Sequence, residues 1–212
     1  MTIENNDVEQ LGFEGLLADA EKDNKQRSFE NKTAHLPGEV GDAIEYYRAL
    51  LAEHHATMMA ADVDETMRLR DDAHLLAIKL NGGEPGILAE DDAPGCMLAR
   101  VTAAPDGSIP LWGQQAVFVI SLHGMQALVE MDGIFGIGGS HCYWPGFSAS
   151  VVDTHKPFLS ETGYRSFLGI YAEPVSGLSP DEFARAICTR YIEDKLNGKL
   201  VAVAKRYTGE AA

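Results

Sequence analysis

Apolar positions in the front part of the chain follow a helical spacing. Ile44, Tyr47 and Leu51 recur at intervals of three and four residues, the period of an α-helix with one buried face. Asp42 and Glu45 have the spacing of an N-terminal capping pair. The pattern predicts an amphipathic helix whose first turn lies at these two acidic residues.

A second helix is expected to follow directly. Asp62 is a suitable N-cap, and a Gly-Gly pair after Leu80 is a typical helix end. Two helices with so short a connection form an antiparallel hairpin. Asp72 is expected on the solvent side of the second helix. Its buried stripe is predicted to be Val63, Met67, Leu69, Ala73, Leu76 and Leu80.

Beyond a stretch rich in Gly, Pro, Asp and Glu, the apolar runs become short and are separated by turn signals. Asp-Gly and His-Gly pairs favour the positive φ angles of tight hairpins, so we expect an antiparallel meander. A capping Ser179 with Pro180 predicts a helix that runs to about Leu196. The expected strands are Met97–Ala103, Ala116–Leu122, Gln126–Met131, Ser148–Val152 and Phe167–Ala172, with a last one at Leu200–Ala204.

The predicted fold class is therefore α+β, with an N-terminal antiparallel helical hairpin and then an antiparallel sheet packed with a C-terminal helix. The hairpin and the sheet are expected to form one cooperative unit over residues 37–212, because two helices cannot enclose a core alone. The divisions are an N-terminal arm at 1–36, an acidic helical hairpin at 37–82, a linker at 83–95 and an α+β sheet domain at 96–212.

Acidic residues outnumber basic ones, and the excess lies in the front half. The net charge is -15, with -13 in residues 1–95 and -2 in residues 96–212. Such a field repels phosphate backbones and anionic lipid surfaces, which argues against nucleic-acid or membrane partners and leaves a basic protein partner as the complementary one. The basic cluster near the C-terminus is interpreted as a solvated tail: Lys195, Lys199, Lys205 and Arg206.

Cysteine spacing and the apolar runs indicate a cytoplasmic protein. Cys96, Cys142 and Cys188 are widely spaced and form no C-x-x-C pair, so neither a disulfide framework nor a zinc knuckle is expected. The first residues lack the basic and apolar regions of a signal peptide. The longest apolar runs are far shorter than a membrane span.

Histidines on the predicted hairpin have the residue types of a helical metal site, since Glu45, Glu53 and Asp71 accompany His54, His55 and His74. The predicted hairpin nevertheless places His54 and His74 at levels that differ by roughly 9 Å. Neither helix carries a His-x-x-x-His or Glu-x-x-His pair. We therefore interpret His54 as a hydrogen-bonded core residue and expect no metal and no cofactor.

Cys142 is a candidate nucleophile in the segment Gly138–Gly146. A thiolate needs a nearby base, and a turn at Pro145-Gly146 would carry Cys142 away from His155. The better candidate for the base is His123, from another turn. The alternative is that Cys142 is a small buried thiol.

The segment from Lys156 to Arg165 is a candidate anion site. Its two ends are cations and its middle carries hydroxyls, which together suit a carboxylate or phosphate. The alternative is a loop whose arginine pairs with a nearby glutamate. The candidate ligand-binding residues are Lys156, Ser160, Thr162, Tyr164, Arg165 and Trp144.

Three classes of function remain open on the sequence alone. The favoured class is a non-catalytic binding or interaction protein that takes a small anion at the 156–165 loop or a basic protein partner. The others are a cysteine-dependent hydrolase or transferase that uses Cys142, and a metal-dependent enzyme on the helical hairpin. The N-terminal arm is a candidate contact for a homo-oligomer.

Overall fold

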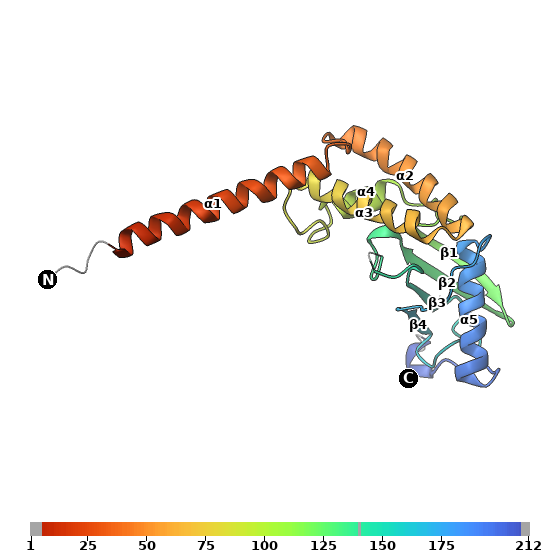
Figure 1. The fold of residues 1–212 in the computed structure, drawn as a ribbon. Coiled ribbons are helices and arrows are strands. Elements are labelled where there is room, and N and C mark those ends of the chain that lie inside the picture. The colour runs from red at the N-terminus through yellow and green to blue at the C-terminus, as the bar shows by residue number, and fades with distance from the viewer. Residues whose placement is uncertain (1–5, 140, 209–212) are drawn as a thin grey trace.

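Helices dominate the first half of the chain, and a four-stranded sheet with one long helix makes up the second half (Figure 1). The computed structural model describes residues 6–139 and 141–208. For residues 6–16 it describes the backbone but not the side chains. The fold is α+β, as the sequence predicts. The elements are α1 (Asn6–Lys32), α2 (Val40–Ala60), α3 (Val63–Leu80), α4 (Pro94–Val101), β1 (Gln115–Leu122), β2 (Met125–Asp132), the 3-10 turn η1 (Gly133–Phe135), β3 (Phe147–Val151), β4 (Tyr164–Phe167), α5 (Pro180–Leu196) and the 3-10 turn η2 (Lys205–Tyr207).

The sheet is an antiparallel meander in the order β1-β2-β3-β4. The β1–β2 hairpin pairs Gln115 with Asp132 at one end and Leu122 with Met125 at the other. Its two-residue turn has φ angles of 48° at His123 and 79° at Gly124, as tight hairpin turns require. This hairpin is confirmed in position and type.

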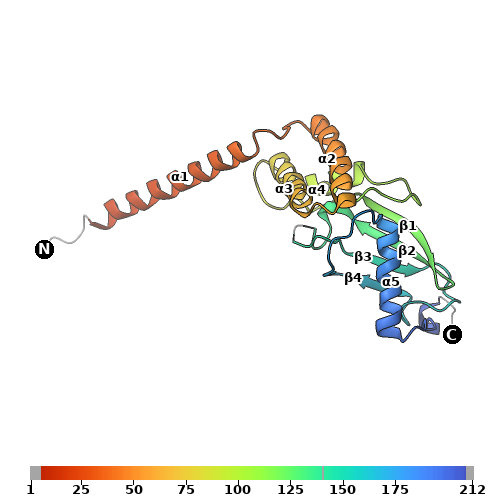
Figure 2. The same cartoon turned by 45° about the vertical axis from the view of Figure 1, so that its right-hand side comes forward.

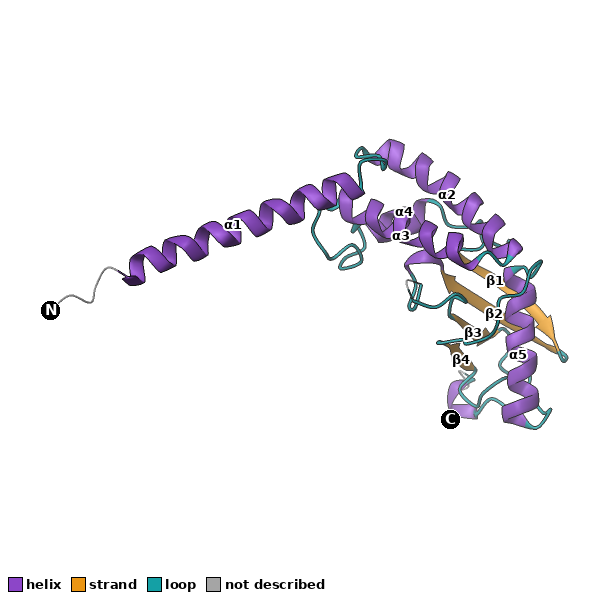
Figure 3. Cartoon of the chain, viewed as in Figure 1, coloured by secondary structure: helices purple, strands orange, loops and turns teal. Residues whose placement is uncertain are grey.

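The sheet has one buried face and one open face. α5 packs on the buried face (Figures 2 and 3), where the core includes Phe118, Phe147, Phe183 and Cys188. No described helix covers the opposite face, and alternate residues of β1 are exposed there. We call this surface the open face of the sheet.

The helical part has a core of its own. Asp62 caps α3, since its side chain accepts the backbone N–H of Glu65 at 3.1 Å, and Ala61 turns the chain with a φ of 58°. α4 and η1 complete this core. Its buried residues are Leu36, Ala43, Tyr47, Leu50, Leu51, Leu69, Ala73, Leu76, Ala77, Leu98, Ile134 and Phe135.

Three predicted strands differ from the structure. The run Met97–Ala103 lies mostly in α4, because Pro94 at the first helical position and the Met, Leu, Ala and Arg that follow favour a helix. The strand expected at Phe167–Ala172 ends at Phe167, and Gly169 at a φ of 62° turns the chain away from β3. Residues 200–204 contribute a single bridge, from Val201 to Phe158.

The helical hairpin also differs in detail from its prediction. α2 begins at Val40 with Glu39 as N-cap and no capping side chain, so the Asp42 signal misplaced its start. Val63 is 38% exposed rather than buried. Asp72 is buried, because Arg68 of the same helix donates to it at 2.6 Å and His35 of the preceding segment lies 3.4 Å away.

α1 projects away from the rest of the molecule (Figure 1). Its base is tied down where the Lys79 ammonium donates to the carbonyls of Thr33 and Leu36, at 2.9 and 2.6 Å. Leu17 is 50% exposed. The expected contact of this arm with another copy of the chain stays a prediction.

Candidate functional site

Cys142 and His123 lie at opposite ends of β2. His123 occupies the turn before this strand, whereas Cys142 follows η1 at its far end. Seven residue steps along a strand correspond to about 23 Å, whereas a nucleophile and its base must lie within hydrogen-bond reach. The structure therefore does not bring the predicted pair together.

The hydroxyls of the 156–165 loop are bonded within the loop itself. The Oγ atoms of Ser160 and Thr162 lie 3.0 Å apart. Both hydroxyls donate to the carbonyl of Tyr164, at 2.7 and 3.1 Å. These bonds shape the turn into β4 and use the donors that an anion would need.

The other predicted ligand-binding residues face different surroundings. The guanidinium of Arg165 lies 4.5 Å from the ring centroid of Tyr191 on α5, while the Lys156 ammonium lies 4.0 Å from Asp153. Trp144 is 2% exposed, its indole N–H donates to the carbonyl of Ala172 at 3.1 Å, and it belongs to the core. The loop therefore does not gather these six side chains around one space.

His54 is hydrogen-bonded through both ring nitrogens. Its Nδ1 lies 2.9 Å from the Trp112 carbonyl and its Nε2 accepts from Arg70 Nε at 2.9 Å, which defines the neutral tautomer with the proton on Nδ1. Burial first, and then the charge of Arg70, lower the pKa of His54 to about 3. Its neighbour His55 accepts the backbone N–H of Trp112 at 3.1 Å, and burial lowers its pKa as well.

No metal site is formed by these histidines. Within residues 6–139 and 141–208, no group of three or more His, Cys, Asp or Glu side chains is placed to hold an ion. His74 Nδ1 lies 2.8 Å from the carbonyl of Arg70 on its own helix.

Among the helices that the structure describes, none combines the length and the apolar composition that a membrane span requires.

Arg70 joins the helical hairpin to the loop that follows η1. It is 2% exposed, and its guanidinium donates to the carbonyls of Gly139, Cys142 and Tyr143 at 3.2, 2.6 and 2.8 Å. Burial lowers the pKa of Arg70 to about 10, so the group stays charged at neutral pH. We call these bonds, with the one to His54, the Arg70 clamp. Sequence reasoning missed it because arginine is rarely buried fully.

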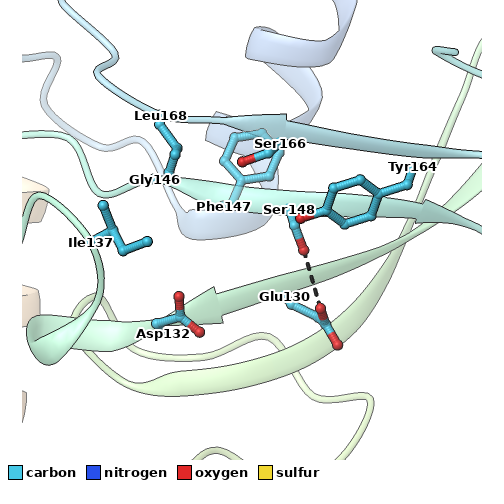
Figure 4. Close-up of a pocket in the computed structure, with 9 residues that line it drawn as sticks. All are labelled: Glu130, Asp132, Ile137, Gly146, Phe147, Ser148, Tyr164, Ser166 and Leu168. Atoms are coloured by element: carbon cyan, nitrogen blue, oxygen red, sulfur yellow. Dashed lines mark hydrogen bonds between the residues drawn. The ribbon is translucent and has the colours of Figure 1, made fainter. Parts of the chain in front are cut away.

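The open face of the sheet carries a pocket of about 200 Å³. Figure 4 shows Glu130 and Asp132 of β2 on one side, Ser148 of β3 in the middle and Tyr164 of β4 on the other side. The Ser148 hydroxyl donates to a Glu130 carboxylate oxygen at 3.1 Å. The remaining lining residues are Ile137, Gly146, Phe147, Ser166 and Leu168.

The strand register explains why these side chains meet. Glu130 is paired with Ser148, and Ser148 with Ser166, so the three form one row across the open face. Side chains two residues apart on a strand share a face, which adds Asp132 beside Glu130. The lining thus combines two carboxylates, hydroxyls and an aromatic ring, with no cationic side chain among the residues that form it.

Of this pocket, the sequence interpretation singled out only Tyr164. The signal for the rest was the alternation of β2, in which Gln126, Leu128, Glu130 and Asp132 lie on one face and apolar residues on the other. The sequence alone does not show that β3 and β4 place hydroxyls and a ring beside those carboxylates, because that depends on long-range strand pairing.

Comparisons with known proteins relate this chain to one named group. The family described as the KlcB third domain matches residues 115–202, which run from β1 to just beyond α5. A protein KlcB from Escherichia coli is 32% identical over 170 residues, which cover 79% of this chain and 40% of that protein. Another protein KlcB from Escherichia coli is 33% identical over 142 residues, 66% of this chain and 29% of that protein. No solved structure matches this chain.

The chain thus spans less than half the length of the relatives it matches. Neither the family description nor the relatives' names states an activity, a ligand or a partner. The candidate pocket lies inside the region that the family matches, because most of its lining residues belong to β2, β3 and β4.

Proposed function

We propose that this chain is a non-catalytic binding protein whose open sheet face takes a positively charged side chain of a protein partner. The observation that carries the proposal is the pocket of Figure 4, in which two carboxylates face an aromatic ring across a serine hydroxyl and no lysine or arginine lines the space. A bound guanidinium or ammonium group would supply the missing charge.

Each part of the lining has a role toward such a group. A carboxylate accepts two parallel N–H bonds from a guanidinium, and Glu130 and Asp132 offer four acceptor oxygens between them. The ring of Tyr164, 49% exposed, can hold a cation against its face. The two contributions reinforce each other, because both favour the same sign of charge.

The volume of the pocket and the net charge of the chain both favour a protein ligand. A volume of about 200 Å³ is below the ~300–1,000 Å³ of ordinary small-molecule sites, and it suits one inserted side chain of a larger partner. The net charge of -15 attracts a basic partner over distances of about a Debye length, which raises the association rate at low salt. Binding is therefore expected to weaken with ionic strength.

The other classes of function stay predictions with less support. The separation of Cys142 from His123 speaks against the hydrolase hypothesis, and the internal bonds of Ser160 and Thr162 speak against a preformed anion site. The Arg70 clamp occupies the residues around His54 with structural bonds, which leaves the metal hypothesis without ligands there.

The test is a titration of the protein with acetyl-Gly-Arg-Gly-amide, followed by backbone amide shifts in NMR spectra. We expect saturable shifts at Glu130, Ser148 and Tyr164, and roughly three- to tenfold weaker binding in Glu130→Gln/Asp132→Asn, since each exposed ion pair contributes up to about 1 kcal/mol. The matched control, Asp106→Asn/Glu193→Gln, removes the same charge from exposed sites outside the pocket lining and should bind like the wild type. Shifts spread over the whole acidic surface, or equal loss in both double variants, would contradict the proposal.

A further inference from the structure

A second cavity adjoins the pocket of the proposed function. It has a volume of about 310 Å³ and lies between α4, the segment before it and the start of β1. Asp132 lines both cavities, and Gln115 of the second cavity is its strand partner on the open face. The two cavities therefore share Asp132, and their lining residues taken together run from α4 to β4.

The second cavity carries charges of both signs, because the carboxylates of Asp91 and Asp132 line it together with one arginine. Arg100 of α4 lines it, and its guanidinium donates to the backbone carbonyl of Asp91 at 2.9 Å. Asp132 lines the same cavity, but among the described residues Arg100 forms no salt bridge with it. By contrast, Arg68, Arg185 and Arg190 all pair with carboxylates. Arg100 thus retains N–H donors for a carboxylate that comes from outside the chain.

We propose that the two cavities form one groove for an extended peptide segment that carries a basic residue at Glu130 and Asp132 and an acidic residue at Arg100. This proposal rests on the proposed function, to which it adds the shape of the ligand and its second charge. From β2 to β4 the groove crosses two strand spacings, about 10 Å, and α4 extends it further. That length requires several peptide residues at about 3.3 Å each.

The walls of the groove favour a peptide over a single amino acid. Ile137 is 72% exposed and Leu168 54% exposed beside the acidic cavity, and Leu88 is 46% exposed beside Arg100. These apolar side chains line both cavities, so apolar residues of a bound segment would contact them in addition to its charged groups. Burial of such surface contributes roughly 25 cal/mol per Å².

The order of charge gives the groove a direction. A segment that places its acidic group at Arg100 must place its basic group toward β2, and the reverse placement sets like charges against each other. Opposite charges at two separated points discriminate between ligands more than they raise affinity. The groove is therefore expected to select peptides by the spacing and the order of two charges.

The experiment uses acetylated and amidated Gly-Ser peptides with one Arg and one Glu, separated by one to four residues in both orders, together with their Arg-only, Glu-only and neutral parents. Affinities are measured by the NMR titration described above. We expect one spacing and order to bind about three- to fivefold more tightly than the Arg-only peptide. Arg100→Gln should abolish that difference without weakening the Arg-only peptide.

Charge exchange provides a readout that a merely structural role of Arg100 would not affect. Arg100→Glu should reverse the preference for an acidic second residue. In this variant, the best two-charge peptide with its Glu replaced by Lys should bind more tightly than the peptide that keeps the Glu. The control Arg190→Glu changes the charge of α5, outside both cavities, and should leave the order of affinities unchanged.

A thiol in the second cavity reports occupancy independently. Cys96 lines this cavity and is half-buried, and Cys188 is fully buried. In a Cys142→Ser background, the best two-charge peptide at saturation should slow the alkylation of Cys96 at least threefold, and the Arg-only peptide should not. Equal affinity of all Arg-containing peptides with unprotected Cys96 would overturn the groove and leave the proposed function intact. Failure of every Arg-containing peptide to bind would overturn both.

Discussion

Acid should destabilise this protein through His54. The imidazole is held neutral between the Trp112 carbonyl and Arg70, and its pKa is lowered to about 3. A protonated ring would direct its Nε2–H at the Arg70 guanidinium, so the charged form is disfavoured by burial and by repulsion. In the unfolded chain the same ring has an ordinary pKa near 6.5.

The sign follows from which state takes up the proton. Because the folded pKa is lowered, the unfolded state binds more protons between about pH 6.5 and pH 3, and stability falls as the pH falls through this range. One proton changes the free energy of unfolding by about 1.4 kcal/mol per pH unit. At pH 4.5 the expected loss from His54 is therefore about 2.7 kcal/mol.

The assay is urea unfolding from pH 7.5 to 4.5 on wild type and on His54→Gln. Glutamine also offers a donor and an acceptor but does not titrate, so this variant is less stable at pH 7.5 yet loses less stability on acidification. The difference between the two proteins should shrink by about 1.4 kcal/mol per pH unit below pH 6. Parallel curves, or a ring pKa above 6 for His54 by NMR, would refute the reasoning.

Three further predictions concern the core. Arg70→Met leaves three loop carbonyls without their donor and should lower the free energy of unfolding by about 3 kcal/mol or more, as measured in urea. Gly113→Ala adds a Cβ at 2.8 Å from His54 Nδ1 at a φ of +93° and should cost about 2 kcal/mol or more, against about 1 kcal/mol for the control Gly107→Ala, where φ is +76° with open space around the Cβ. Burial raises the pKa of the Cys188 thiol to about 12, so a thiol reagent at pH 8 should label two cysteines in the folded protein and three in guanidinium chloride.

Local signals in the sequence sufficed for most of the fold. The helix cap at Asp62, the hairpin turn at His123-Gly124 and the start of α5 after Ser179 depend on nearby residues, and all three are confirmed. The strand predicted at Met97 was wrong because a short apolar run fits a helix or a strand equally well. There the preceding Pro94 decided the outcome.

The candidate site was harder to predict, because strand pairing assembles it. Glu130 and Ser148 are 18 residues apart in the chain, and only the β2–β3 register brings them into contact. The Arg70 clamp was equally hard to predict. The position of Arg70 on α3 was predictable, but the carbonyls that accept its hydrogen bonds are about 70 residues away in the chain. A periodic pattern indicates which face of an element is buried, not what lies against it.

The Arg70 clamp limits which segments of the chain can be expressed alone or exchanged between relatives. The segment matched by the KlcB third domain begins at residue 115, after the arginine, both histidines of α2 and Trp112. A fragment that starts there would keep the acceptor carbonyls and lose their donor. We therefore expect the sheet not to fold stably without α2 and α3. A chimera that exchanges sheets between relatives would then have to move the two helices as well.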